Sequence, residues 1–289
     1  MNSRNLLNLG LAVALLILGG FIVFSQQEPS PVETARLTSF AMADIIRIEI
    51  RPARHADTLL ERRDGEWRLV EPFTARADTA RVDAAIGLAR ARSLARYDAS
   101  AVDTQQAGLV SPDLVLRVND VTLALGGTEP LRGQRFVRQG DQVHLIVDRY
   151  SYLLQGEPAS LVSPRLLPAG AHLQEIVLPG LHLLQRNGHW QLAEGEAASA
   201  DALQALVDEW RHARALRVSR RDGDEDGEPI ILQLAADTAP VHFILQRGDE
   251  EVLLIRPDRG LAYHFLPAVA ERLLVLPPVE AATGGDTDA

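Results

Sequence analysis

The chain of 289 residues has no cysteine and no lysine, so arginine alone supplies its 29 basic side chains. The lack of cysteine excludes a thiol nucleophile, a cysteine zinc site, an iron–sulfur cluster, a disulfide and a lipid attached through cysteine. The lack of lysine excludes Schiff-base catalysis and a phosphate-binding P-loop. No G-x-S-x-G or G-x-G-x-x-G motif occurs either. No catalytic motif is therefore visible in the sequence, and a hydrolase would have to use aspartate, glutamate, histidine or serine side chains that only the fold brings together.

Positive charge is also scarce, because 39 acidic residues outnumber the basic ones and give a formal net charge of -10. This balance argues against nonspecific binding to nucleic acid. Hydrophobic residues make up 46% of the chain and charged residues 24%, as is typical of folded globular proteins. The length suits two modules of roughly 100 to 150 residues each.

One long hydrophobic run lies near the N-terminus. Residues 6–24 (LLNLGLAVALLILGGFIVF) include a single polar side chain, Asn8. A helix of this length can cross a hydrocarbon core of about 30 Å. A cleaved signal peptide is the rival interpretation, but its apolar region is shorter and ends at small residues, whereas this run ends at Phe24-Ser25-Gln26-Gln27. The run therefore predicts an uncleaved transmembrane helix.

The charges that flank this run predict its orientation. Arg4 precedes it, and Glu28 and Glu33 follow it. Because positive charge favours the cytoplasmic side, we expect residues 1–5 in the cytoplasm of a bacterium and the bulk of the chain in the periplasm, anchored to the inner membrane.

The rest of the sequence predicts an α+β fold in which one module, built of a β-hairpin, a helix and an antiparallel sheet, occurs twice. In the first copy, alternation predicts a strand at 46–50, Asp64-Gly65 a hairpin turn, and Asp78 the cap of a helix that ends near Leu94. A polar loop from Tyr97 to Pro112 follows, and then two more hairpins. The same order recurs from Ile176, with a turn at Asn187-Gly188, a helix from about Ser199 and four strands between 230 and 266.

These signals divide the chain into six parts. They are a cytoplasmic N-terminus (1–5), a transmembrane helix (6–24), a linker (25–42), module 1 (43–163), module 2 (164–277) and a disordered tail (278–289).

Several short motifs resemble one known family when they are taken in order. They are Gly65-x-Trp67-x-Leu69, Ala77-Asp78 at the start of a helix, Gly108-Leu109-x-x-Pro112, Leu125-Gly126 and Arg135-Phe136-Val137. The chain thus resembles the domain of unknown function 4340 (DUF4340) family over about 45–154, and more faintly over 176–274. The resemblance implies a membrane-anchored bacterial protein, an auxiliary of an ABC-type transport system, and it implies no catalytic residue.

The most specific local motif is acidic. Asp222, Asp224, Asp226 and Glu228 lie in a loop that fits D-x-D-x-D-G, the opening of a calcium-binding loop. Gln233 stands where the bidentate glutamate of such a loop belongs, and a strand is expected to follow. The motif therefore predicts either a weak calcium site or a solvated acidic loop.

Histidines, tryptophans and arginines supply the other candidates. His144 and His264 hold equivalent repeat positions and could form a paired metal or proton-transfer site, but alternation favours exposed strand positions for both. Trp67 and Trp190 could be stacking platforms, although a repeated tryptophan after a hairpin turn favours the core. One hairpin carries three further candidates, which could hold an anionic polymer or lipid or serve only solubility: Arg132, Arg135 and Arg138.

The function that these features favour is a noncatalytic binding or assembly protein of an envelope or transport complex, with no cofactor other than the calcium considered above. The inner membrane and a protein of that complex are the expected partners. A hydrolase acting on envelope material is the alternative, and a calcium-stabilised structural module is another.

Overall fold

The computed structural model describes residues 36–195, 198–221, 226–235 and 239–277. The predicted transmembrane helix, most of the predicted linker and the predicted tail lie outside these ranges. Within them, no helix is long and apolar enough to cross a membrane. Two residues of the predicted linker, Leu37 and Thr38, are buried, and the Leu37 N–H donates to the Ala91 carbonyl at 2.9 Å.

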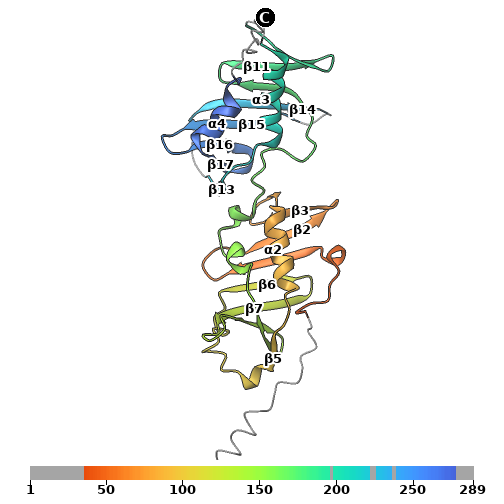
Figure 1. The fold of residues 1–289 in the computed structure, drawn as a ribbon, viewed down its shortest axis with the longest axis vertical. Coiled ribbons are helices and arrows are strands. Elements are labelled where there is room, and N and C mark those ends of the chain that lie inside the picture. The colour runs from red at the N-terminus through yellow and green to blue at the C-terminus, as the bar shows by residue number, and fades with distance from the viewer. Residues whose placement is uncertain (1–35, 196–197, 222–225, 236–238, 278–289) are drawn as a thin grey trace, which may run out of the picture. The chain divides into compact units, whose positions relative to one another are not determined.

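The described chain is mostly antiparallel β-sheet with few helices (Figure 1). The first sheet has nine strands in the order β4-β3-β2-β1-β6-β7-β8-β9-β5. Its strands are β1 (Arg47–Pro52), β2 (Thr58–Arg63), β3 (Glu66–Glu71), β4 (Ala75–Arg76), β5 (Ala95–Asp98), β6 (Leu114–Val118), β7 (Val121–Thr128), β8 (Arg135–Gln139) and β9 (Gln142–Ile146). The helices of this part of the chain are η1 (Met42–Asp44), α2 (Thr79–Ala89), η2 (Ala99–Ala101), η3 (Ser151–Leu154) and η4 (Pro158–Leu161).

The second sheet has eight strands in the order β12-β11-β10-β14-β15-β16-β17-β13. Its strands are β10 (Leu173–Leu178), β11 (Leu181–Arg186), β12 (His189–Leu192), β13 (Arg217–Arg220), β14 (Glu228–Leu234), β15 (Val241–Arg247), β16 (Val252–Arg256) and β17 (Leu261–Phe265). The helices here are α3 (Ala200–His212), η5 (Pro257–Arg259) and α4 (Pro267–Leu274). The antiparallel sheets of the predicted α+β fold are confirmed, while helices make up a smaller share than that class implies.

With the two-residue strand β4 set aside, the two sheets share one strand order. Along the chain, three antiparallel strands come first and a helix follows them. The next strand lies at the far edge of the sheet, and the last four strands form a meander between that edge strand and the first three. Packing divides the described residues differently, into one compact unit within 36–45 and 85–151 and a second within 46–84 and 152–277.

The hairpin turns lie where the sequence predicts them. Asp64 and Gly65 have φ angles of 52° and 83°, and Asn187 and Gly188 have φ angles of 50° and 82°. Two consecutive residues with positive φ match the right-handed twist of the flanking strands, so these turns close the β2–β3 and β11–β12 hairpins.

Both predicted helix caps are present. The Asp78 carboxylate accepts from the Ala80 N–H at 3.1 Å, and the Ser199 hydroxyl accepts from the Ala202 N–H at 3.1 Å. Helix α2 ends at Ala89, five residues before the predicted end near Leu94. Past that point the backbone has other partners, because the Leu94 N–H donates to the Leu145 carbonyl at 2.8 Å and so begins the pairing of β5 with β9.

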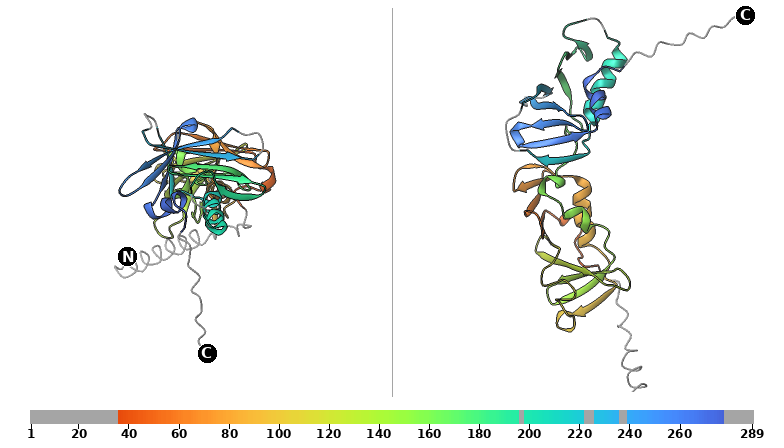
Figure 2. Two further views of the ribbon diagram at one scale, coloured as in Figure 1. Left: turned by 90° about the horizontal axis from the view of Figure 1, so that it is seen from above. Right: turned by 90° about the vertical axis from the view of Figure 1, so that its left-hand side faces the viewer.

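Helices α3 and α4 lie side by side on one face of the second sheet (Figures 1 and 2). Helix α3 buries the four residues predicted to face inward: Leu203, Leu206, Val207 and Trp210. The Trp210 indole N–H donates to the Leu273 carbonyl of α4 at 2.8 Å, and its ring lies 6.4 Å from that of Phe243 in β15. Trp210 of α3 therefore contacts both helix α4 and strand β15 of the sheet.

Candidate functional site

The main candidate site is a cavity of about 480 Å³ within the second compact unit, which we call the arginine cavity. Four arginines line it: Arg68 of β3, Arg76 of β4, Arg256 of β16 and Arg259 of η5. Asp258 is the only carboxylate among its described lining residues, and Tyr263 of β17 adds a phenol hydroxyl. The cavity thus has an excess of positive charge in a chain that is acidic as a whole.

Arg76 is held by backbone carbonyls. Its guanidinium donates to the carbonyls of Leu167 at 2.9 Å, Arg165 at 2.8 Å and Leu166 at 3.3 Å. No carboxylate of the described residues pairs with it, and burial lowers its pKa below the ordinary arginine value. The positive charge of Arg76 is thus fixed in place but not neutralised.

Asp258 neutralises part of the charge contributed by Arg256 and Arg259. It forms a bidentate pair with Arg256, at 3.0 and 2.7 Å, and lies 3.4 Å from the Arg259 Nε. Burial tends to raise the pKa of Asp258, but hydrogen bonds and charge from these two arginines hold it below its ordinary value. Asp258 therefore stays ionised and cannot act as a proton donor at neutral pH.

Tyr263 is 5% exposed, and its hydroxyl has no hydrogen-bond partner among the described residues. Burial raises its pKa, while the charges of Arg256, Arg76 and Arg259 act in the opposite direction. The ring packs edge-on against Phe243, at a centroid distance of 6.2 Å. The hydroxyl therefore stays protonated and can donate a hydrogen bond into the cavity.

A second cavity, of about 350 Å³, also has Arg76 in its lining. Trp67, Arg165 and Arg214 line it as well. Trp67 is only half-buried, so the prediction that it belongs to the core is wrong, whereas Trp190 is 7% exposed and its core prediction is confirmed. The difference has a simple origin, since the face of β3 that carries Trp67 borders this cavity.

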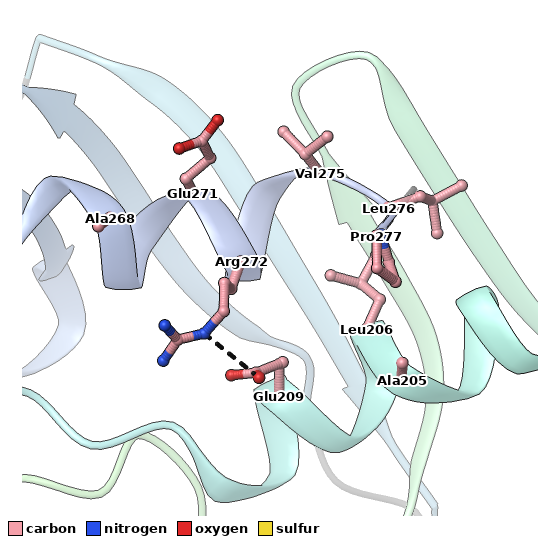
Figure 3. Close-up of a pocket in the computed structure, with 9 residues that line it drawn as sticks. All are labelled: Ala205, Leu206, Glu209, Ala268, Glu271, Arg272, Val275, Leu276 and Pro277. Carbon is pink, nitrogen blue, oxygen red and sulfur yellow. Dashed lines mark ion pairs between the residues drawn. The ribbon is translucent and has the colours of Figure 1, made fainter. Parts of the chain in front are cut away.

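An apolar groove of about 330 Å³ lies between α3 and α4 (Figure 3). Leu206, Val275, Leu276 and Pro277 provide most of its apolar surface. The only ion pair drawn across it joins Glu209 and Arg272, at 3.4 Å. The groove is largely apolar, and Glu209, Glu271 and Arg272 are the charged residues among its described lining.

Ser219, His264 and Glu251 form a chain of hydrogen bonds in the second sheet. The Ser219 Oγ lies 2.8 Å from the His264 Nε2, and the Glu251 Oε2 lies 2.8 Å from the His264 Nδ1. This is the order and spacing of a nucleophile, a base and an orienting carboxylate. Ser219 comes from β13, a strand that the sequence did not predict, so no sequence signal could have found the arrangement.

Arg217 shares the same histidine. Its guanidinium lies 3.1 Å from the His264 Nε2 and 2.9 Å from the Glu251 Oε2. Because arginine can only donate, the Nε2 is an acceptor and the Nδ1 carries the proton given to Glu251. That hydrogen bond from His264 lowers the pKa of Glu251, and the charge of Arg217 adds to the effect. Arg217 thus competes with Ser219 for the atom that would act as base.

His144 and His264 are both buried, so the prediction of exposed strand positions is wrong for each. His144 pairs with Arg96 of β5 in register, and its Nδ1 lies 2.9 Å from the Ser93 Oγ. Burial, and then the charge of Arg96, lowers its pKa. Arg96 of β5 lies beside His144, and Ser219 and Arg217 of β13 lie beside His264; neither edge strand was part of the predicted fold. Among the described residues, no group of three histidine, aspartate or glutamate side chains could hold a metal.

The acidic loop is described only in part. Asp222 and Asp224 lie outside the described residues, so the structure does not test the calcium prediction. Asp226 is exposed, and the Glu228 carboxylate lies 3.2 Å from Arg247. The predicted strand after the loop is β14.

The three candidate arginines of the β8 region do not act together. Arg132 and Arg138 are exposed, whereas Arg135 is half-buried and pairs with Asp148 at 2.6 Å and with Asp113 at 3.1 Å. Burial tends to raise the pKa of Asp148, but hydrogen bonds from Ser151 and the charge of Arg135 hold it below its ordinary value. Arg135 is therefore an internal ion-pair partner.

A family model described as a domain of unknown function (DUF4340) matches residues 67–230, which is more than half of the chain. The chain belongs to the DUF4340 family. No curated protein and no solved structure matches it. The DUF4340 match starts at Trp67 in β3 and ends at Ile230 in β14, so it includes strands of both sheets.

Two of the motifs that carry the DUF4340 resemblance meet in the structure. Gly108 has a φ of 67°, and the Gly127 N–H donates to the Ala107 carbonyl at 2.8 Å. A side chain at Gly126 would overlap that same carbonyl oxygen. The Gly108-Leu109-x-x-Pro112 and Leu125-Gly126 motifs therefore form one tight backbone contact, whose role is packing.

Proposed function

We propose that this DUF4340 protein is a noncatalytic, membrane-anchored periplasmic protein that binds a partner or ligand in an envelope or transport complex. The arginine cavity carries the proposal, because it combines accessible volume with fixed positive charge and a phenol hydroxyl that has no partner among the described residues. Asp258, the one carboxylate among the lining residues that the structure describes, is held ionised by two arginines, as suits binding rather than proton transfer. The shared strand order of the two sheets supports a duplicated module.

The anchor is tested on the full chain. We expect the protein to remain with the membrane through a carbonate wash, and a chain that begins at Val32 to be released, because residues 6–24 can span the bilayer. Replacing Leu15 and Leu16 together with arginine should also release it, since each charge at a helix centre costs about 2.5–3.5 kcal/mol on insertion scales. A mature N-terminus near Gln26, found by mass spectrometry, would show a cleaved signal peptide instead.

The binding role is tested by photo-crosslinking in cells. A crosslinking residue at position 67 lies at the smaller cavity beside Arg76, and the matched control at Leu131 is 91% exposed and remote from both cavities along the chain. We expect a discrete crosslinked species from position 67 and none from position 131. The same products from both positions, or none from either, would count against a binding role for this region.

A hydrolase is the second candidate, and the Ser219–His264–Glu251 geometry favours it. Three observations weigh against it. Ser219 pairs with Ala262 in a regular strand, Arg217 occupies the same histidine nitrogen, and none of the cavities described above is lined by the three residues.

A fluorophosphonate probe separates the two candidates, because it labels only serines activated by a base. We expect no labelling of the full chain under conditions that label a control serine hydrolase completely. Labelling that Ser219→Ala abolishes and Glu251→Gln reduces at least tenfold would establish the hydrolase.

A calcium-stabilised module is a third proposal with less support, because Glu228 is already paired with Arg247.

A further inference from the structure

The arginine cavity holds more positive charge than its described residues neutralise. Four arginines and one carboxylate line the cavity among the described residues, and Asp258 is already shared between Arg256 and Arg259. Among the described residues, Arg68 has only a distant exposed partner, Glu66, at 3.8 Å. Within the described part of the chain, the hydrogen-bond partners of Arg76 are all carbonyls. Arg68 and Arg76 are paired across β3 and β4, and arginines that line one cavity with little counter-charge can bind oxyanions, whose geometry a guanidinium group matches.

Neutral donors and apolar surface complete the site. The Tyr263 hydroxyl has no acceptor among the described residues and lines the same cavity. Leu166, Leu167 and Leu261 line it too, together with prolines. A ligand seated here would meet charged donors at one part of its surface and hydrocarbon at another.

We propose that the arginine cavity binds an oxyanion, a phosphate or a carboxylate, carried on a small apolar body. The oxyanion lies against Arg68, Arg76 and the Tyr263 hydroxyl, and the apolar body against the leucines. This assignment rests on the proposed binding function and names the ligand class of its site. Carbonyls hold the Arg76 head group in position before the ligand arrives, so little side-chain entropy is lost on binding.

The test is calorimetric titration of the full chain in detergent with three probes that share an aromatic body. Phenyl phosphate and phenylacetate carry the two oxyanions, and benzyl alcohol is the uncharged control. We expect one site per chain for at least one of the two anions, with affinity that falls as salt is raised, and at least tenfold weaker binding of benzyl alcohol. The stronger of the two anions identifies which oxyanion the site takes.

The variants locate the site. Tyr263→Phe removes one hydroxyl and should weaken anion binding about three- to tenfold, the range for one hydrogen bond. Arg68→Gln and Arg76→Gln should each weaken it about tenfold or more. Arg132→Gln is the matched control, because it removes an exposed arginine outside the cavity and should change nothing. Melting temperatures show which variants fold, and Arg68 is exposed enough for its variant to be tolerated.

Two results would overturn the assignment. The first is no heat with either anion at millimolar concentration. The second is equal weakening by Arg132→Gln and Arg68→Gln, which would mean nonspecific charge attraction. Neither result bears on crosslinking at position 67, so a failed anion site with a positive crosslink would leave the binding function in place. If an anion bound but no crosslink formed at position 67, the anion site would stand and the partner-binding role would not.

Discussion

Trp210→Ala is expected to lower the free energy of unfolding by about 3–5 kcal/mol, the range for removing a large aromatic side chain from a packed core. Trp210 is fully buried, and its indole N–H donates to the Leu273 carbonyl at 2.8 Å. Its removal leaves a cavity between α3, α4 and β15 and a buried carbonyl without its donor, which adds to the cost. Urea unfolding of the chain that begins at Val32 measures the change.

Trp67→Ala is the matched control, because it truncates the same residue type at a half-buried position in β3. We expect it to cost less than half as much as Trp210→Ala, since a side chain that borders a cavity loses fewer contacts. Equal losses in the two variants would contradict the burial that separates these tryptophans.

Hairpins and helix starts could be predicted from the sequence because their signals are local. Asp64-Gly65 and Asn187-Gly188 supply the positive φ angles that two-residue turns require, and Asp78 and Ser199 supply side-chain acceptors for free N–H groups. Each signal acts within four residues of the structure that it predicts. Their repetition in the same order also predicted two sheets of like topology, and the strand order agrees.

The edge strands could not be predicted in the same way. β5 (Ala95–Asp98) and β13 (Arg217–Arg220) are four residues long and largely polar, so neither shows the alternation of a half-buried strand. Their partners, β9 and β17, lie 41 or more residues further along the chain. Missing these strands led directly to the wrong exposure for His144 and His264, because residues of the missing strands lie beside both.

No pattern in the sequence predicted the arginine cavity. Its four arginines come from β3, β4, β16 and η5, and every basic residue in the chain is arginine, so none stands out by type. The Ser219–His264–Glu251 chain is similar, since its members lie on β13, on β17 and before β16. Both sites result from tertiary packing, which composition and periodicity do not encode.

Gly126→Ala is expected to destabilise the chain by about 1–3 kcal/mol, the usual cost of forcing extra volume into a packed site. A methyl group at this position would overlap the Ala107 carbonyl oxygen and lie 2.9 Å from the Leu109 Cδ2. Relief requires the backbone near Ala107 to move away from β7, which breaks the 2.8 Å hydrogen bond from the Gly127 N–H. Ala107 and Leu109 pack with Val143 in one core cluster, so the disturbance spreads to β9.

Gly127→Ala is the control, because it adds the same methyl group one residue later, where the nearest atom lies at 3.6 Å. Neither glycine has a positive φ, so backbone freedom does not distinguish the two, and only the close approach at Gly126 does. We expect Gly127→Ala to change the unfolding free energy by less than about 0.5 kcal/mol, the usual range for substitutions without a steric mechanism. Similar losses for both variants would mean that β7 requires glycine for its strand geometry. A loss confined to Gly126→Ala would show that two of the family's motifs serve a single backbone contact.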